Sequence, residues 1–420
     1  MADTASAAEQ KLAWNPFKTP SKGLASVLPF WGKAPTTKED HAAEAALLSH
    51  GRLSVATDSQ TPSAVAGLVS KITDVEIDAS GNYIHTLSIE QASGRPSKHN
   101  LVITHGYFTG LGFFFRNYDE LSKVDGWNVY SIDWLGMGRS SRPTYTSQRA
   151  SEDQRVAAAE SFFVESLEEW RSRMGLEKMT LCGHSFGGYM SALYALKYPE
   201  RVEKLVLVSP IGIPEPPEGY EEMLRNGGGP LRKPPTPTPS PGQSQTPEAP
   251  QSAKPTADDV AKPGIRRVMF FRMAMNLWER NFAPQWVVRS AGPFGRRLID
   301  WYIGRFSWLS EEQRVSLAAY AHQISVLPGS SESALGDILR PGAFARRPLV
   351  GRIAGLQMPT VFMYGKNDWV DYTGGAEVIE RIGGRVATNM YRIPKAGHNL
   401  HLENPADFNK AMVREMKVLD

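Results

Sequence analysis

The segment Gly183-His184-Ser185-Phe186-Gly187 constrains the fold more than any other part of this 420-residue chain. An apolar run at 179–183 precedes it, and a helical pattern at 187–198 follows it. A serine in so sharp a strand-to-helix turn has a strained backbone, so the residues two positions away must be nearly free of side-chain atoms. The turn would present the serine Oγ above a sheet, with backbone N–H groups at a helix start. Ser185 is therefore a candidate nucleophile, the alternative being a glycine-rich turn without a reactive serine.

Strands and helices alternate along most of the chain. A hairpin is expected from strands at 73–79 and 83–90, around the turn Ser80-Gly81-Asn82. A helical period at 156–174 lies among the later strands. Those later strands are expected at 101–104, 129–133, 179–183, 204–208, 360–364 and 390–393. Continuous apolar strands that alternate with helices predict a mostly parallel sheet covered by helices on both faces.

An inserted segment interrupts this alternation after Pro214. Residues 227–263 are so rich in Pro, Gly, Ser, Thr and Gln that we expect a disordered loop. Residues 264–352 then show helical patterns between two of the expected strands, as an inserted helical cap would. The predicted division is a tail at 1–50, a core at 60–213 and 354–420, and a cap at 214–353.

The other catalytic candidates follow later strands. Asp368 and Asp371 lie in the loop after 360–364, and either carboxylate could orient an imidazole. Asp368, three residues after a glycine, is preferred. His398 stands in the loop beyond the last strand, where a general base is expected, and His401 is a less favoured substitute. The order serine, acid, histidine is typical of the α/β-hydrolase fold, in which the histidine takes the serine proton and returns it to the leaving group.

Backbone donors for a developing oxyanion are expected at two places. His105 and Gly106 end the strand at 101–104, and the N–H of Tyr107 would be one donor. Phe186, directly after the nucleophile, would supply the other N–H, and each donor is worth roughly 3–4 kcal/mol. The side chain of His105 and the loop from Asp133 to Ser141 are interpreted as parts that shape the site rather than react.

Composition argues against several other kinds of site. The net charge of +3 gives no sign of a nucleic-acid partner. Cys182 is the single cysteine, so no intramolecular disulfide can form, which favours an intracellular protein. The nine histidines show no metal-ligand spacing and no nucleotide-binding glycine pattern occurs, so we expect no metal and no cofactor. No apolar run is long enough to predict a transmembrane helix.

Two segments suggest contact with lipids. Residues 11–33 combine lysines with aromatic residues and contain no acid, which suits the headgroup layer of a bilayer, unless these aromatics simply pack on the core. Residues 264–352 contain 13 arginines, no lysine and six acidic residues. Since guanidinium binds phosphate in a bidentate fork, this apolar and arginine-rich cap suits a substrate with acyl chains and a phosphate head. The alternative is a solvated helix face.

Six segments carry a resemblance to a known family. They are His105-Gly106-Tyr107, Asp133 to Ser141, Gly183 to Gly188, Val288 to Gly295, Tyr320 to Ile353, and Ala396 to Pro405. Together they resemble the lipid-metabolising α/β-hydrolases that include the lipase co-activator of lipid droplets, the N-acylphosphatidylethanolamine lysophospholipase and the fungal mitochondrial cardiolipin-specific deacylase. The resemblance spans residues 40–415 apart from the Pro-rich insert.

The resemblance implies an active enzyme, because the animal co-activator lacks the elbow serine that this chain has at Ser185. The group also carries an H-x-x-x-x-D pattern linked to acyl-CoA-dependent acylation of lysophosphatidic acid. Here the pattern runs from His398 to Glu403, with Glu in place of Asp, which leaves acyl transfer open. Some animal members have the triad acid at the position of Asp371, so this residue stays in reserve.

Three functions are expected in order. The first is a serine hydrolase that deacylates a phospholipid of the cardiolipin or N-acylphosphatidylethanolamine type to a lysolipid and a fatty acid. The second is a lysophosphatidic acid acyltransferase that uses acyl-CoA. The third is a non-enzymatic lipase co-activator or lipid-surface scaffold, against which the complete triad argues. The expected partners are a phospholipid or lysophospholipid and a peripheral membrane surface, in the mitochondrion first, with the lipid droplet or cytosol as alternatives.

Overall fold

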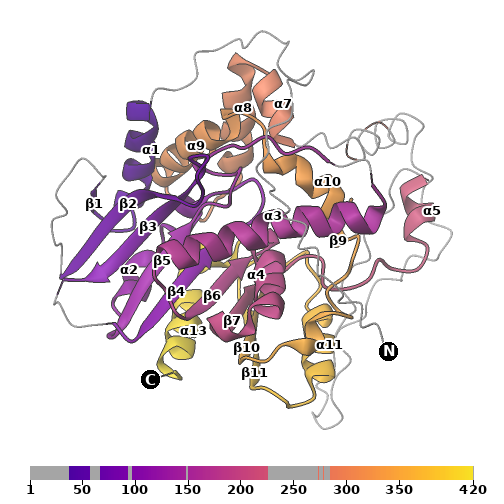
Figure 1. Cartoon of the computed structure of the whole chain (residues 1–420). Coiled ribbons are helices and arrows are strands. Elements are labelled where there is room, and N and C mark those ends of the chain that lie inside the picture. Colours follow the sequence, from indigo (N-terminus) through magenta and orange to yellow (C-terminus); the bar gives the residue numbers. More distant parts are fainter. Residues whose placement is uncertain are drawn as a thin grey trace, which may run out of the picture.

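A mixed sheet lies at the centre of the molecule (Figure 1). The computed structural model describes residues 37–56, 67–92, 97–147, 150–225, 273, 278 and 284–419, and nine strands of this part form the sheet. Its spatial order is β1-β2-β3-β5-β4-β6-β7-β10-β11. The strands are β1 (Val55–Ala56), β2 (Leu68–Glu76), β3 (Tyr83–Gln91), β4 (His99–Thr104), β5 (Trp127–Ile132), β6 (Met179–His184), β7 (Val202–Val208), β10 (Thr360–Gly365) and β11 (Thr388–Ile393). The predicted membrane-interacting segment 11–33 and the Pro-rich loop 227–263 lie outside the described residues.

The strand pairing is parallel except at β3, which pairs antiparallel with both β2 and β5. The predicted hairpin between β2 and β3 is confirmed, but its first strand begins at Leu68 and ends at Glu76. It ends there because the Asp78 carboxylate accepts hydrogen bonds from the Ser80 and Asn82 N–H groups, at 2.8 and 3.0 Å, and closes the turn. The predicted class, a mostly parallel sheet with helices, is confirmed.

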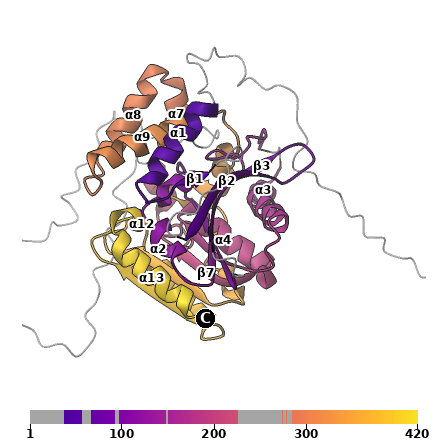
Figure 2. The ribbon, with the colours of Figure 1, turned by 90° about the vertical axis from the view of Figure 1, so that its left-hand side faces the viewer.

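Helices cover both faces of the sheet (Figure 2). One face carries α3 (Glu152–Arg173), α4 (Phe186–Lys197) and α11 (Thr373–Ile382), and the other carries α2 (Tyr118–Ser122) and α13 (Pro405–Lys417). Alternate strand side chains pack beneath them: Leu181 of β6 lies in the first layer and Cys182 in the second. A fully buried aliphatic side chain such as that of Leu181 stabilises the fold by about 1.5–3 kcal/mol.

The parallel strands β5, β4, β6, β7, β10 and β11 all end at the same edge of the sheet. Ligands of open α/β sheets bind outside this carboxyl edge. The segments that follow β6, β10 and β11 carry Ser185, Asp368 and His398, respectively. Chain positions more than 200 residues apart therefore meet at one edge.

A cap of helices lies over this edge. Its described helices are α7 (Pro284–Ser290), α8 (Pro293–Gly304), α9 (Glu311–Val326) and α10 (Ala334–Ile338), with α5 (Tyr220–Arg225) before them. A small hairpin of β8 (Leu339–Arg340) and β9 (Phe344–Ala345), which the sequence did not predict, follows. Short 3-10 helices and α12 complete the elements: η2 (Leu111–Phe114), η3 (Pro199–Arg201), η5 (Ser331–Ser333), η6 (Ile353–Gly355) and α12 (Leu400–Glu403). None of the helices in the described ranges has the length and apolar character needed to cross a bilayer.

Helix α1 (Thr37–Ser49) lies within the range predicted as a tail. Its side chains Leu47 and Leu48 are fully buried, and it packs against α9 of the cap. The helix therefore joins the cap to the outer part of the sheet, beside β2 and β3 (Figure 2).

Candidate active site

The turn between β6 and α4 holds Ser185 in a strained conformation, with φ 54° and ψ −115°. The Ser185 N–H donates to the Val208 carbonyl of β7 at 2.9 Å, which fixes the turn to the sheet. A Cβ atom at Gly183 would lie 2.4 Å from the Gly187 carbonyl oxygen, and one at Gly187 would lie 2.6 Å from the His105 carbonyl oxygen. Both glycines are thus required by contact with backbone, as the sequence pattern predicts.

Ser185, His398 and Asp368 form one continuous chain of hydrogen bonds. The Ser185 Oγ lies 2.9 Å from His398 Nε2, and His398 Nδ1 lies 3.1 Å from Asp368 Oδ1. In this arrangement the carboxylate holds the imidazole with Nε2 toward the hydroxyl, so that Nε2 can accept its proton. The geometry is that of an activated nucleophile with an oriented base.

The Asp368 carboxylate is held as the anion. The Val370 N–H donates to it at 3.0 Å, and the Ser209 hydroxyl donates to its second oxygen. Burial alone would raise the pKa of Asp368, but His398, Ser209 and Val370 N–H together lower it below the ordinary value. Asp371, the reserve acid, instead accepts from Thr373 N–H at 2.9 Å near the start of α11.

The two residues expected to supply oxyanion donors both lie near Ser185. Phe186 is the first residue of α4 and is fully buried, and Tyr107 lines the same pocket as Ser185. A Cβ atom at Gly106 would lie 3.1 Å from Ser185 Cβ, so the loop that carries Tyr107 passes directly beside the nucleophile. The Tyr107 hydroxyl donates to Gln285 of α7, which ties this loop to the cap.

Glu403 lies beside the backbone of the His398 loop. Its carboxylate accepts hydrogen bonds from Gly397 N–H at 2.7 Å and from Asn399 N–H at 3.1 Å, the two residues that flank His398. The carboxylate therefore shapes the loop that presents the imidazole, and Glu403 is not among the residues that line the pocket.

Three buried histidines surround the site without taking its proton-transfer position. Burial, with the nearby His398, lowers the pKa of His184 to about 3, so its neutral ring donates from Nε2 to the His398 carbonyl at 3.0 Å. Burial also lowers the pKa of His105, whose Nε2 accepts from Trp134 N–H at 3.2 Å. The His401 ring stacks on Phe114 with ring centroids 4.2 Å apart, and burial lowers its pKa well below the ordinary value. All three shape the site.

A pocket of about 100 Å³ opens beside Ser185 and His398. Its walls join core and cap: Phe113 comes from the core, Ile299 and Ile303 from α8, and Ala321 from α9. None of the described lining residues is an arginine. The other residues around it are Tyr107, Phe108, Thr109, His184, Tyr302 and Asn399.

The arginines of the described part of the cap do not line the pocket. Arg289 pairs with Glu332, and Arg352 pairs with Glu160 of α3 at 2.7 Å. Arg346 pairs with Glu152 at 2.8 Å. These pairs fasten parts of the cap to one another and to the core, which sequence alone could not distinguish from phosphate binding.

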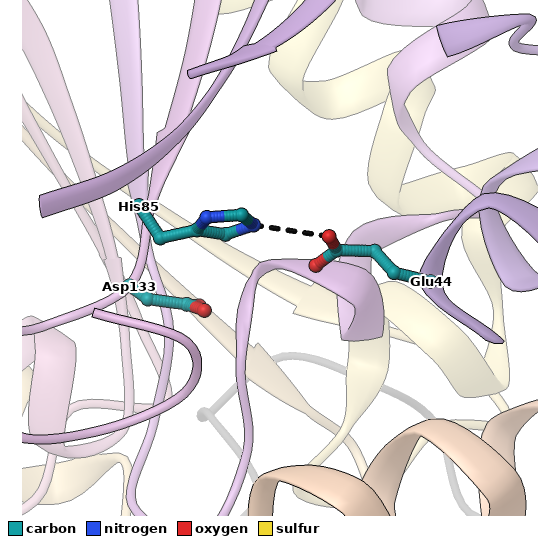
Figure 3. A group of neighbouring side chains, drawn as sticks. All are labelled: Glu44, His85 and Asp133. Carbon is teal, nitrogen blue, oxygen red and sulfur yellow. Dashed lines mark hydrogen bonds and ion pairs between the residues drawn. The ribbon is translucent and has the colours of Figure 1, made fainter. Parts of the chain in front are cut away.

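A cluster of possible ligand atoms occurs among the described residues at Glu44, His85 and Asp133 (Figure 3). Their donor atoms lie within 4.8 Å of one another, but both His85 nitrogens already contact carboxylates, Glu44 at 3.0 Å and Asp74 at 2.6 Å. The Arg139 guanidinium lies 3.6 Å from Glu44. Burial would lower the pKa of His85, but the charge of Glu44 and the hydrogen bonds to both carboxylates raise it to about 10. The imidazolium and the guanidinium thus supply the positive charge that these carboxylates need.

Sequence analysis missed two contributors to the site. Ser209, which holds Asp368, directly follows the carboxyl end of β7, and a hydroxyl at that edge was the available signal. Gln285 contacts Tyr107 across 178 chain positions, and no local pattern indicates that contact.

Comparisons with known proteins agree on the family. A family model described as "alpha/beta hydrolase fold" matches residues 100–231. The 1-acylglycerol-3-phosphate O-acyltransferase of Arabidopsis thaliana is 34% identical over 79% of this chain and 69% of its own length. The 1-acylglycerol-3-phosphate O-acyltransferase ABHD5 of Rattus norvegicus is 31% identical over 79% of this chain and 80% of its own. The (lyso)-N-acylphosphatidylethanolamine lipase of Mus musculus is 31% identical over 79% and 81%.

Solved structures show the same fold at low sequence identity. A bromoperoxidase from Bacillus anthracis superposes with a TM-score of 0.52 at 16% identity, over 82% of this chain and 99% of that one. An esterase from Exiguobacterium antarcticum gives a TM-score of 0.51 at 15% identity, over 82% and 99%. With relatives above 30% identity over most of both chains, the protein belongs to the α/β-hydrolase family, in the group that contains these acyltransferases and this lipase.

Proposed function

We propose that this protein is a serine hydrolase that removes an acyl chain from a phospholipid. In this proposal Ser185 is the nucleophile, His398 the general base and Asp368 the acid that orients the base. The observation that carries it is the continuous hydrogen-bond chain from Ser185 Oγ through His398 to Asp368, at the wall of a pocket shared by core and cap.

The geometry supports a two-step reaction. Ser185 Oγ attacks the ester carbonyl while His398 Nε2 takes its proton, and the Tyr107 and Phe186 N–H groups stabilise the oxyanion. The tetrahedral intermediate collapses when His398 returns this proton to the lysolipid oxygen, which leaves an acyl group on Ser185. Water, deprotonated by His398, then attacks the acyl group, and Ser185 and a fatty acid are released.

The pocket walls support a lipid acyl chain as the substrate group. Phe113, Ile299, Ile303 and Ala321 give it apolar walls, and His398 lies beside Ser185. A phospholipid of the N-acylphosphatidylethanolamine type is favoured by the mouse relative that is named a lipase for that lipid class. A cardiolipin-type phospholipid is the other headgroup class that we propose, on the resemblance of the cap and triad segments.

The second candidate is acyl transfer to lysophosphatidic acid, and the names of the plant and rat relatives favour it. In that reaction Ser185 would take the acyl group from acyl-CoA with release of the thiol. The lysophosphatidic acid hydroxyl, deprotonated by His398, would then replace water. The contacts of Glu403 with Gly397 N–H and Asn399 N–H support a positioning role in either reaction.

Lipid product analysis tests the proposal. Wild type and Ser185→Ala are incubated with mixed phospholipid vesicles, with and without lysophosphatidic acid and acyl-CoA. We expect a parent phospholipid to give the matching lysolipid and fatty acid with wild type, and a rate about a millionfold lower with Ser185→Ala. If new phosphatidic acid forms and its formation requires acyl-CoA, the protein is an acyltransferase and the hydrolase proposal is wrong. Unchanged lipids in both assays would favour a lipase co-activator or scaffold.

The proposed location is a peripheral membrane surface. The order of compartments, mitochondrion before lipid droplet and cytosol, stays a prediction from the resemblance. Microscopy of the tagged full chain together with compartment markers tests it, and a signal on another organelle would contradict it.

A further inference from the structure

Helix α8 is apolar on two faces, and within the described part of the chain only the inner face is buried. Ile299 and Ile303 on the inner face are buried and line the pocket. On the outer face Phe294, Leu298 and Trp301 are 62%, 42% and 66% exposed. Large apolar side chains that are grouped in this way on a solvent-exposed protein surface are typical of a site of contact with a partner or a membrane.

The outer apolar residues form a stripe with arginines between them. Positions 294, 297, 298, 301 and 305 follow the three- and four-residue spacing that places side chains on one side of a helix. The Arg297 guanidinium lies 5.4 Å from the centre of the Phe294 ring, and the Arg305 guanidinium lies 4.4 Å from that of Trp301. The two exposed rings of Phe294 and Trp301 thus each have an arginine guanidinium beside them at the surface.

The charge of this helix is positive. Arg296 pairs with Asp300 at 2.8 Å, which leaves Arg297 and Arg305 as the charges beside the exposed rings. The neighbouring helix α7 adds the exposed Trp286 and Val287 (Figure 2). Aromatic rings at the depth of the headgroups, with arginines among the phosphates, are the pattern of a helix that lies in a membrane interface.

We infer that the outer face of α8, with Phe294, Arg297, Leu298, Trp301 and Arg305, docks on an anionic phospholipid surface. Charge complementarity selects this occupant, because an apolar partner would leave both guanidinium groups desolvated without a counter-charge. Lipid phosphates accept hydrogen bonds from arginine while the acyl boundary accepts the rings.

Docking would place the pocket at the membrane. Ile299, Tyr302 and Ile303 of the same helix line the pocket with Ser185, so the helix separates the nucleophile from the bilayer by its own thickness. The docking itself does not depend on Ser185. Only its use, the delivery of an acyl ester from the bilayer to the pocket, rests on the proposed function.

A fluorescent label on the outer face tests the docking directly. Leu298→Cys in the full chain carries a polarity-sensitive thiol dye, and the native Cys182 is buried and so is shielded from it. The matched control is Val418→Cys, an exposed position near the C-terminus, which both views place far from α8 (Figures 1 and 2). Vesicles are phosphatidylcholine alone or phosphatidylcholine with phosphatidylglycerol.

We expect a blue shift of the dye emission at position 298 with the anionic vesicles, a smaller one with phosphatidylcholine alone, and none at position 418. Removal of Arg297 and Arg305 together, as Arg297→Gln and Arg305→Gln in the labelled chain, should weaken vesicle binding about twenty-five-fold, since each arginine near an anionic surface changes affinity about fivefold. Arg173→Gln on α3 is the charge control. Thermal unfolding of each variant verifies that it folds.

Three results would overturn the inference: no shift at 298, an equal shift at 298 and 418, or full binding without the two arginines. A shift at position 298 that appears without vesicles when the protein concentration is raised would instead assign this face to contact with a second copy of the chain. Vesicle binding with no lipid turnover would contradict the proposed function alone, whereas turnover with no shift at 298 would contradict the docking alone.

Discussion

The loop after β10 offers His398 two carboxylates, and only Asp368 contacts it. Asp368 lies 3.1 Å from the imidazole and is held by Ser209 and Val370, whereas Asp371 is used near the start of α11. In sequence the two acids stand three residues apart in the same loop, so their roles depend on the direction in which the loop turns.

This difference gives a prediction for the two acids. We expect Asp368→Asn to lower kcat about ten-thousandfold, because the imidazole loses the anion that fixes its tautomer. Asp371→Asn should retain activity near that of wild type, since this carboxylate accepts a hydrogen bond from Thr373 N–H near the start of α11, whereas His398 contacts Asp368. Turnover of a soluble ester measures both, with thermal unfolding as the control for folding. A greater loss of kcat in Asp371→Asn than in Asp368→Asn would mean that Asp371, and not Asp368, orients His398.

Glu403 gives a second prediction at the residue scale. Glu403→Ala removes the acceptor of two N–H groups beside His398, so we expect kcat to fall about hundredfold through misplacement of the imidazole. The loss should be equal for hydrolysis and for acyl transfer to lysophosphatidic acid. Glu403→Gln, which keeps one acceptor oxygen, should lose less. Loss of acyl transfer with intact hydrolysis would instead make Glu403 an acyltransferase residue.

Among the site residues, those fixed by local geometry were predictable from sequence. The glycines at 183 and 187 lie against backbone, so their spacing around Ser185 is visible in one segment. Gln285 was not predictable, because its partner Tyr107 lies 178 positions away. Ser209 offered a hydroxyl at the carboxyl edge of the sheet as a signal, but its partner Asp368 lies 159 positions away. Such contacts depend on how the strands are ordered in the sheet.

At the scale of elements, helix α1 was not predicted, like the small hairpin of β8 and β9. It begins inside a range without a strong apolar period, yet Leu47 and Leu48 are buried and Glu44 reaches His85 of β3. The signal was weak because the helix is held at few positions. Strands β4, β6, β7 and β10, in contrast, are apolar on both faces and were found within two residues of their observed bounds.

The His85 network gives a prediction for the attachment of α1. The pKa of His85 is raised from 6.5 to about 10 in the folded protein, so its charged form stabilises the fold fully below pH 6.5 and this contribution is lost as the pH rises through about 10. We expect His85→Gln to lower the free energy of unfolding by about 3–5 kcal/mol at pH 6.5, because it leaves a buried carboxylate without its partner.

Denaturant unfolding of wild type and His85→Gln at several pH values measures this effect. The difference between the two proteins should shrink from pH 6.5 to 10, since wild type then loses the imidazolium that the variant lacks. Asp74→Asn, which removes the half-exposed partner, should cost less than about 1 kcal/mol. A difference that does not change with pH would mean that His85 is uncharged in the folded protein.

At the scale of the whole molecule, the sheet and the cap contribute different parts of the site. The carboxyl edge of the sheet gathers the reacting groups from distant segments, and the cap closes the pocket with α8 and α9. One contact between core and cap lies at Tyr107, whose hydroxyl donates to Gln285 of α7 while its N–H faces the oxyanion in the proposed mechanism.

This division predicts that surface residues of α8 affect vesicle substrates more than soluble ones. Phe294→Ser with Trp301→Ser removes the two most exposed rings of the stripe, so less protein is held at the surface where the phospholipid is. We expect the ratio of turnover on anionic phospholipid vesicles to turnover on a soluble ester to fall at least about tenfold. Val418→Ser, an exposed apolar residue removed far from the cap, should leave that ratio as in wild type. A parallel loss on both substrates would show that these rings support the pocket itself, because damage to the pocket does not depend on how the ester is presented.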